Sequence, residues 1–129
     1  MGCCKGLPEC QDHIVRMEML KESHNSIKKN VGTKTLIEKI TEWHHERNLI
    51  EGSTDKDQFC KLMQEAGELS DSICKGKSVS DDIGDMLVVL VNIAERNGLS
   101  ICECLAQAWL DIRDRKGVMV DGVFVKDGD

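Results

Sequence analysis

Apolar residues recur at intervals of three and four over most of the chain, which is the spacing of one face of an α-helix. This pattern predicts helices over residues 13–29, 33–48, 55–74, 79–96 and 100–113. The residues expected to face inward are Phe59, Leu62, Met63, Ala66, Leu69 and Ile73 in the third helix, and Ile83, Met86, Leu87, Leu90, Ile93 and Ala94 in the fourth. Trp43 lies on the stripe of the second helix, where we expect core packing, with stacking on a base as the alternative.

Polar and glycine residues mark the ends of these helices. Residues 52–55 form a loop and N-cap cluster before the third helix, and Gly76 is expected just after its end. Ser78 or Ser80 is expected to cap the fourth helix. Ser100 and Glu103 have the spacing of a capping box, so they predict the start of the fifth helix.

The periodicity changes after Gly117. Two runs of apolar β-formers, 118–120 and 123–125, flank Asp121-Gly122, which is the strongest short signal for a two-residue hairpin turn. The sequence therefore predicts an all-α fold, a four- to five-helix bundle with a short C-terminal β-hairpin. We expect residues 1–32 to form an N-terminal tail with an extra helix, and residues 33–129 to form the domain.

Composition narrows the class of protein. The chain has 129 residues and a net charge of −6, which argues against a generic nucleic-acid binder. A phosphorylated substrate would therefore need a bound cation to attract it. No stretch is long and apolar enough for a membrane span, and seven cysteines without an export signal favour a reducing compartment, so a cytoplasmic location is expected. Cys60, Cys74, Cys102 and Cys104 are expected to be buried or half-buried.

Two acidic pairs are the main candidates for chemistry. Glu65 with Glu68, and Asp82 with Asp85, are each spaced i,i+3, so both members of a pair project from one side of a helix. In two antiparallel helices the registers place Glu65 opposite Asp85, and Glu68 opposite Asp82. Four converging carboxylates repel one another unless a cation lies between them, and oxygen ligands favour Mg²⁺ or Mn²⁺.

Glycines inside both acidic motifs support a functional interpretation. Gly67 and Gly84 each cost a helix about 1 kcal/mol relative to alanine, and their missing side chains would let another helix or a ligand approach. The alternative is an ordinary solvated acidic surface, which a single pair would normally indicate. A di-iron carboxylate bundle is a further alternative, but its Glu-x-x-His motif is absent from both pairs.

Taken together, these motifs resemble the MazG-like branch of the all-α nucleoside triphosphate pyrophosphohydrolases, over about residues 33–127. The resemblance rests on three stretches: Gln58-x-x-Lys61-Leu62-x-x-Glu65-x-Gly67-Glu68-Leu69, Asp82-Ile83-Gly84-Asp85, and Asp114-Arg115-Lys116-Gly117-x-Met119-Val120-x-Gly122-Val123-Phe124-Val125-Lys126. The last stretch is similar to the tail of small, often phage-encoded members.

The resemblance implies Mg²⁺-dependent hydrolysis of a (deoxy)nucleoside triphosphate to its monophosphate and pyrophosphate, in control or cleaning of a nucleotide pool. Glu65, Glu68, Asp82 and Asp85 would hold one or two Mg²⁺ ions, Mn²⁺ being a substitute, and one glutamate would accept a proton from the attacking water. The family is usually dimeric or tetrameric, so a homo-oligomer is expected.

Four further residues are candidates for substrate binding, each with a structural alternative. Lys61 would contact a phosphate or pair with Glu65 one turn later. Arg115 and Lys116 would clamp the triphosphate, or simply place favourable charge at a helix C-terminus. Trp43 is the fourth candidate, and His44 and His45 are interpreted as surface residues.

The chain departs from the family pattern at two positions. The second acidic motif begins with Asp82, where glutamate is typical, and Leu110 occupies a position where many relatives have asparagine. These differences favour a second hypothesis: a helical nucleotide-binding or protein-interaction module that has kept the fold but not catalysis. Such a module would release no pyrophosphate from any nucleotide.

Overall fold

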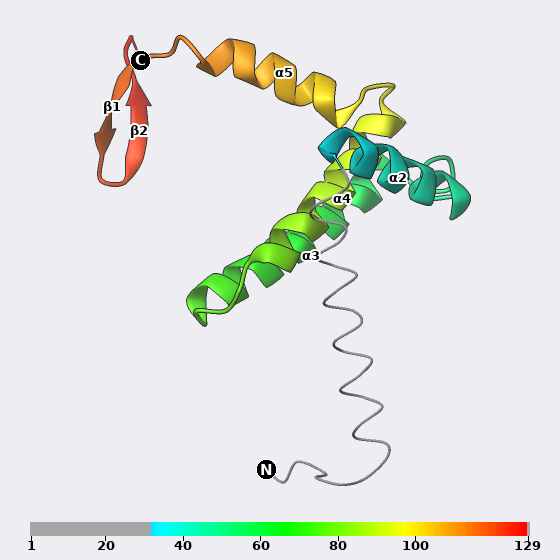
Figure 1. The fold of residues 1–129 in the computed structure, drawn as a ribbon. Helices are drawn as coiled ribbons and strands as arrows, with labels where there is room; N and C mark the ends of the chain where they lie inside the picture. The colour runs from blue at the N-terminus through cyan, green and yellow to red at the C-terminus, as the bar shows by residue number, and fades with distance from the viewer. Residues whose placement is uncertain (1–31, 129) are drawn as a thin grey trace, which may run out of the picture. The chain divides into compact units, whose positions relative to one another are not determined.

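A computed structural model describes residues 32–128. Its elements are helices α2 (Thr33–Glu46), α3 (Asp55–Cys74), α4 (Ser80–Arg96) and α5 (Ile101–Ile112), and strands β1 (Gly117–Val120) and β2 (Val123–Lys126) (Figure 1). The predicted mostly helical fold with a C-terminal hairpin is confirmed. The helix predicted over residues 13–29 lies outside the described residues. In residues 32–128, no helix combines the length and the hydropathy that crossing a membrane requires.

Local signals placed most helix ends correctly. Thr54 is the N-cap of α3, and its hydroxyl accepts a hydrogen bond from the backbone N–H of Asp57 at 3.1 Å. Gly76, just past the end of α3, has the positive φ of 65° for which glycine is favoured. Ser100 and Glu103 form the predicted capping box, in which each side chain accepts a hydrogen bond from the backbone N–H of the other.

The expectation that a serine caps α4 is wrong. Val79 occupies the N-cap and makes no side-chain capping bond, while the Ser78 hydroxyl accepts only a long 3.4 Å hydrogen bond from the N–H of Ser80. Asp81 and Asp82 lie in the first turn instead. Their negative charges interact favourably with the unpaired N–H groups at the start of the helix.

The C-terminal hairpin has the predicted register. Val118 pairs with Val125 and Val120 with Val123, so the turn consists of Asp121 and Gly122. Both turn residues have positive φ, 49° and 82°, as a type I′ turn requires. The Asp-Gly pair therefore fixes the position of the hairpin.

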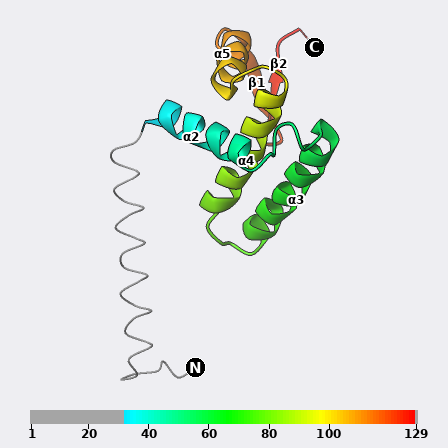
Figure 2. The same ribbon diagram turned by 90° about the vertical axis from the view of Figure 1, so that its right-hand side faces the viewer.

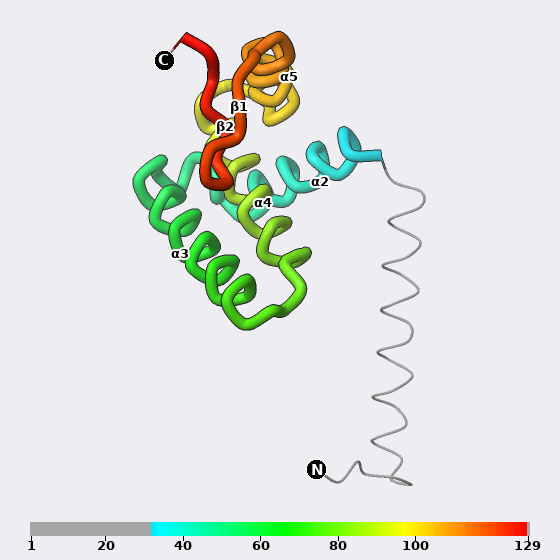
Figure 3. The backbone as a smooth tube through the Cα atoms, turned by 90° about the vertical axis from the view of Figure 1, so that its left-hand side faces the viewer, coloured from blue at the N-terminus to red at the C-terminus, as the bar shows by residue number. Residues whose placement is uncertain are grey.

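Helices α3 and α4 lie side by side and antiparallel, joined by the short connection 75–79, in all three views (Figures 1, 2 and 3). Near the C-terminal end of α2, the side chain of His44 forms a hydrogen bond with the backbone carbonyl of Val88 in α4. The chain divides into two units between Leu36 and Ile37, so most of the described residues belong to the second unit.

Within residues 32–128, Val89, Val91 and Ala94 of α4 are the buried apolar residues. Several residues expected in the core are instead exposed, because among the described elements α3 packs closely against α4 alone and only part of its apolar stripe is covered. These residues are Phe59, Met63, Ile73, Ile83 and Leu87, with 46% to 62% of their surface accessible, and Trp43, with 42%. The core position predicted for Trp43 is therefore wrong.

The cysteines of the described residues are also more exposed than expected. Cys60, Cys74 and Cys102 are exposed and Cys104 is half-buried, and all four are free thiols. None of them is among the buried apolar residues of the described range, all of which lie on α4.

A buried polar network replaces the surface role predicted for His44, whose side chain is 3% exposed. Its Nε2 lies 2.9 Å from the carbonyl oxygen of Val88, and its Nδ1 lies 3.2 Å from the amide nitrogen of Asn92. Because a carbonyl only accepts, Nε2 bears the hydrogen, and Nδ1 accepts from Asn92. The Asn92 amide also donates to the carbonyl of Leu49 at 2.9 Å, which ties the connection after α2 to α4.

Candidate metal centre

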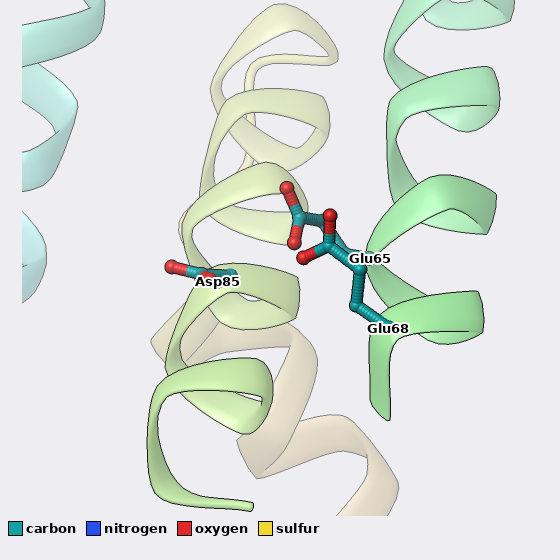
Figure 4. A group of neighbouring side chains, drawn as sticks. All are labelled: Glu65, Glu68 and Asp85. Atoms are coloured by element: carbon teal, nitrogen blue, oxygen red, sulfur yellow. The ribbon is translucent and has the colours of Figure 1, made fainter. Parts of the chain in front are cut away.

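Three of the four predicted carboxylates converge. Glu65 and Glu68 project from α3 toward α4, which supplies Asp85 (Figure 4). Each of the three offers an oxygen, and these oxygens all lie within 4.8 Å of one another. Glu65 is buried, whereas Glu68 and Asp85 are exposed. The mirrored register of the two acidic motifs therefore brings Glu65 and Asp85 together across the helix pair, as predicted.

Asp82 lies outside this cluster, so the predicted group of four is a group of three. Its half-buried side chain lines a shallow depression together with Glu68 and Gly67, and its charge raises the pKa of Glu68 and of Asp85. Aspartate is one methylene shorter than the glutamate typical of the resembling family. In this chain Asp82 lies near the cluster, but it is not one of the three residues whose oxygens converge.

Glu65 is the most constrained member of the cluster. Its Oε1 lies 3.0 Å from Nζ of Lys61, and the two groups form an ion pair. Lys61 is one turn earlier on α3. Its Oε2 is buried and has no hydrogen-bond partner among residues 32–128. The hydrogen bond from Lys61 holds the pKa of Glu65 below its usual value, and the pKa of Lys61 is raised in return. Glu65 is therefore held as a carboxylate with one free oxygen.

The other two carboxyl groups lie near more negative charge than positive charge. The pKa of Glu68 is raised first by the hydrogen bond that its protonated form would donate to Glu65, and then by the negative charge of Glu65. The pKa of Asp85 is raised first by burial, then by the charges of Glu65, Asp81 and Asp82. Among the described residues, Lys61 is the cation that acts on all three groups. A further cation would stabilise the ionised form of each carboxylate.

The residues present fit a hard divalent cation. All three donors are carboxylate oxygens, which suit Mg²⁺ or Mn²⁺ rather than a metal that prefers nitrogen or sulfur. The buried Oε2 of Glu65 would gain the partner that it lacks, since a buried acceptor without a donor costs roughly 1–3 kcal/mol. Ion binding would thus remove two separate costs, repulsion and an unsatisfied acceptor.

A cavity of about 320 Å³ adjoins the cluster, between α2, α3 and α4. It is lined by Trp43, His44, Leu49, Gln58, Lys61, Glu65, Asp85, Val88 and Val89. One face of the Trp43 ring is covered by the guanidinium of Arg47, 4.4 Å from the ring centroid. Two predicted substrate-binding residues, Trp43 and Lys61, are therefore at the site.

Arg115 and Lys116, the other predicted substrate-binding residues, are not brought to this cavity. They are exposed and follow the end of α5, immediately before β1. Conversely, the prediction missed His44 and Leu49 in the cavity wall and Asn92 behind it. One signal was available, because Asn92 is the single polar residue in the apolar run from Met86 to Ala94.

Metal-free protein should become more stable at pH 7 when Glu68 is replaced by glutamine. The pKa of Glu68 is raised in the folded state from 4.5, so its folding contribution is favourable below the unfolded value and is lost as the pH rises through the folded value. The exposed position of Glu68 makes the expected gain small.

Thermal unfolding of wild type and Glu68→Gln in EDTA, at several pH values from 4 to 8, measures this effect. The Tm difference should be largest at neutral pH and should disappear in acid. Saturating Mg²⁺ should reverse its sign, because the variant lacks one ligand. A Tm difference that is independent of pH would contradict the electrostatic explanation.

Comparison with known proteins identifies one informative relative. The chain is 47% identical over 64 residues to an uncharacterized 18.2 kDa protein from the rep–hol intergenic region of Haemophilus phage HP1. The matched segment covers 48% of this chain and 39% of the phage protein, so the chain spans about two fifths of the relative's length. No family model matches the chain, and no solved structure matches it. The comparisons therefore show similarity to a phage-encoded protein.

Proposed function

We propose that this protein is a Mg²⁺-dependent nucleoside triphosphate pyrophosphohydrolase that acts on a nucleotide pool in the cytoplasm. The observation that supports this function most directly is the buried, unpartnered oxygen of Glu65 beside the carboxylates of Glu68 and Asp85. A purely structural acidic surface gives no reason to bury one carboxylate with an oxygen left unsatisfied. The MazG-like motifs named above supply the reaction class.

The cavity beside the cluster has the properties of a site for a nucleoside. Its volume, about 320 Å³, is at the small end of the range for ligand pockets. Val88, Val89 and Leu49 provide apolar walls, and Glu65 and Asp85 lie at its edge. A base and sugar held against these walls would leave the triphosphate beside the carboxylates.

The cluster would hold Mg²⁺ through Glu65, Glu68 and Asp85, with Asp82 close by. When bound, Mg²⁺ would neutralise phosphate oxygens and lower the pKa of a water positioned to attack the α-phosphorus. Lys61 keeps Glu65 ionised and fixes one of its oxygens. The carboxylate of Glu68 is exposed, and no lysine or arginine among residues 32–128 forms an ion pair with it. An Oε atom of Glu68 is therefore better placed than one of Glu65 to accept a proton from water.

The cations have different proposed roles. Lys61 acts as a positioning residue for Glu65, because its ammonium is 3.0 Å from that carboxylate. Arg115 and Lys116 remain proposed contacts to the triphosphate, and within residues 32–128 neither side chain forms an ion pair. Two free cations close together are suited to phosphate oxygens.

The test is a panel of canonical and modified NTPs and dNTPs, assayed separately for pyrophosphate and for orthophosphate with Mg²⁺. We expect pyrophosphate and a nucleoside monophosphate, with no orthophosphate, and complete loss of turnover in EDTA. The relative rates would identify the preferred nucleotide. Folded protein that releases no pyrophosphate with either Mg²⁺ or Mn²⁺ would rule out the proposed reaction.

A catalytically silent module is the second candidate, and the position of Asp82 favours it. With Asp82 outside the group of three, the cluster has one ligand fewer than the four predicted. Such a module would bind nucleotide in the cavity without cleaving it. Calorimetric binding of a non-hydrolysable dNTP analogue, combined with no turnover of the corresponding dNTP, would support this candidate over the enzyme.

A further inference from the structure

Gln58 lies near the start of α3 and lines the cavity beside the carboxylate cluster. Its side-chain amide is held in place, because Nε2 donates a hydrogen bond to Oγ of Ser53 at 2.9 Å. Both residues are half-buried, whereas every other residue from 51 to 60 is exposed. The loop before α3 therefore fixes the orientation of the Gln58 amide at the cavity wall.

The carbonyl oxygen of this amide is an acceptor that the cavity offers to an uncharged group of a ligand. No group in the described part of the chain donates a hydrogen bond to Oε1 of Gln58, and this oxygen remains accessible. The other uncharged side-chain acceptor in the cavity wall, Nδ1 of His44, is occupied by the amide of Asn92. The carboxylates in the wall belong to the candidate metal centre. A ligand that fills the cavity must therefore bring a donor to Gln58.

Gln58 shares one face of α3 with the metal centre. Gln58, Lys61 and Glu65 are spaced i, i+3, i+7, so their side chains project from the same side of the helix. The seven residues from Gln58 to Glu65 correspond to a rise of about 10 Å along the helix axis. With the α-phosphate at the carboxylates, the sugar and the base extend along α3. The edge of the base that is farthest from the sugar then meets Gln58.

Trp43 offers a stacking surface in the same cavity. The guanidinium of Arg47 lies over the indole ring, 4.4 Å from its centroid, and Arg47 does not line the cavity. Arg47 therefore supports the ring from outside, and a base can stack on the side that faces the cavity, between Trp43 and the apolar walls of Val88 and Val89. Stacking accepts every base, so selection among bases depends on Gln58.

We propose that Gln58, positioned by Ser53, selects a base with an amino group at its far edge, which makes a cytosine nucleotide the preferred substrate. This inference rests on the proposed pyrophosphohydrolase function and names its substrate class. The 4-amino group of cytosine donates to Oε1, whereas the 4-carbonyl of uracil or thymine places two acceptors face to face. Adenine has an amino group at the equivalent edge, but a cavity of about 320 Å³, at the small end of the range for ligand pockets, favours a single ring.

Discrimination between pyrimidine nucleotides tests this proposal. The kcat/KM for dCTP should exceed that for dUTP at least ~30-fold, because two facing acceptors leave each other without a partner. We expect dTTP and dATP to be poorer substrates than dCTP as well. Equal values for dCTP and dUTP, or a preference for dATP, would overturn the proposal and leave the pyrophosphohydrolase function standing.

Variants separate a selective role of Gln58 from a structural one. Gln58→Leu should bring the kcat/KM values for dCTP and dUTP to within ~3-fold of each other. Ser53→Ala should raise the value for dUTP, because the freed amide can rotate and present its N–H to the 4-carbonyl. Gln58→Glu keeps an acceptor, to which the Ser53 hydroxyl can donate, and should retain the preference for dCTP.

Gln107→Leu is the matched control, because it makes the same amide-to-leucine change at an exposed position of α5 that does not line this cavity. It should leave the ratio of the two kcat/KM values unchanged. A purely structural role of Gln58 would lower both values together in Gln58→Leu and preserve their ratio, and this result would overturn the proposal.

Calorimetry with the α,β-methylene analogues of dCTP and dUTP measures base selection without turnover. Tighter binding of the dCTP analogue by protein that releases no pyrophosphate would support the role of Gln58 and rule out the proposed reaction. Equal affinity for the two analogues, together with pyrophosphate release, would rule out the role of Gln58 alone. The two proposals can therefore fail separately.

Discussion

Replacing Glu65 by glutamine is expected to lower kcat/KM for pyrophosphate release by at least ~10³-fold, which is about 4 kcal/mol of transition-state stabilisation. Glutamine has nearly the same shape, so the helix pair should be preserved. The change removes the negative charge from the one cluster residue that is both buried and paired with Lys61. Cation affinity and electrostatic stabilisation of the phosphates should therefore be lost together.

The measurement compares steady-state kinetics with Mg²⁺ affinity from calorimetry and with helix content from circular dichroism. Glu38→Gln is the control, because Glu38 is an exposed glutamate of α2 outside the cluster and the cavity. Its kinetics should match those of the wild type. If Glu65→Gln stayed within tenfold of the wild type while remaining folded, Glu65 would not be an essential metal ligand.

Asn92→Leu is expected to lower the free energy of unfolding by about 2–4 kcal/mol. The side chain of Asn92 is completely buried, and its amide donates to His44 Nδ1 and to the Leu49 carbonyl. Leucine has a similar volume but no donor, so the buried His44 Nδ1 and the part-buried Leu49 carbonyl would lose their partner, a loss that exceeds the relief of removing the unpartnered Asn92 Oδ1. Such a loss corresponds to a decrease in Tm of roughly 10 °C or more for a domain of about 100 residues.

Urea unfolding followed by circular dichroism, with wild type and variant at the same protein concentration, measures this loss. Gln64→Leu is the matched control, because it makes the same amide-to-leucine change at an exposed position of α3. The control should change stability by less than ~0.5 kcal/mol. An equally small effect of Asn92→Leu would show that the network is not a major source of stability.

Local signals were sufficient to predict the secondary structure from the sequence. The capping box at Ser100, the glycine after α3 and the Asp-Gly turn each depend on residues next to one another in the chain. The spacing of the acidic motifs also predicted that Glu65 and Asp85 would meet, because a short connection leaves two antiparallel helices little choice of register. These features required no knowledge of distant contacts.

Features that depend on packing between distant segments were not predictable in this way. Trp43 and His44 both fit an apolar stripe that includes Ile40, and the structure buries the histidine because Asn92 and Val88 offer it hydrogen bonds. Periodicity identifies which residues avoid water, but it does not say whether the same chain covers them.

The rotational positions of Lys61, Glu65 and Glu68 on α3 constrain where the length of this chain can change. One residue inserted or deleted between Lys61 and Met63 would turn everything beyond it by about 100°, moving Glu65 and Glu68 relative to Lys61, and Met63 relative to Phe59. Such a change would separate the carboxylates of the cluster and interrupt the line of exposed apolar residues on α3 in one step. The connection 75–79 contributes none of the three carboxylates, so a change of length there would leave the rotational positions of Lys61, Glu65 and Glu68 within α3 unchanged.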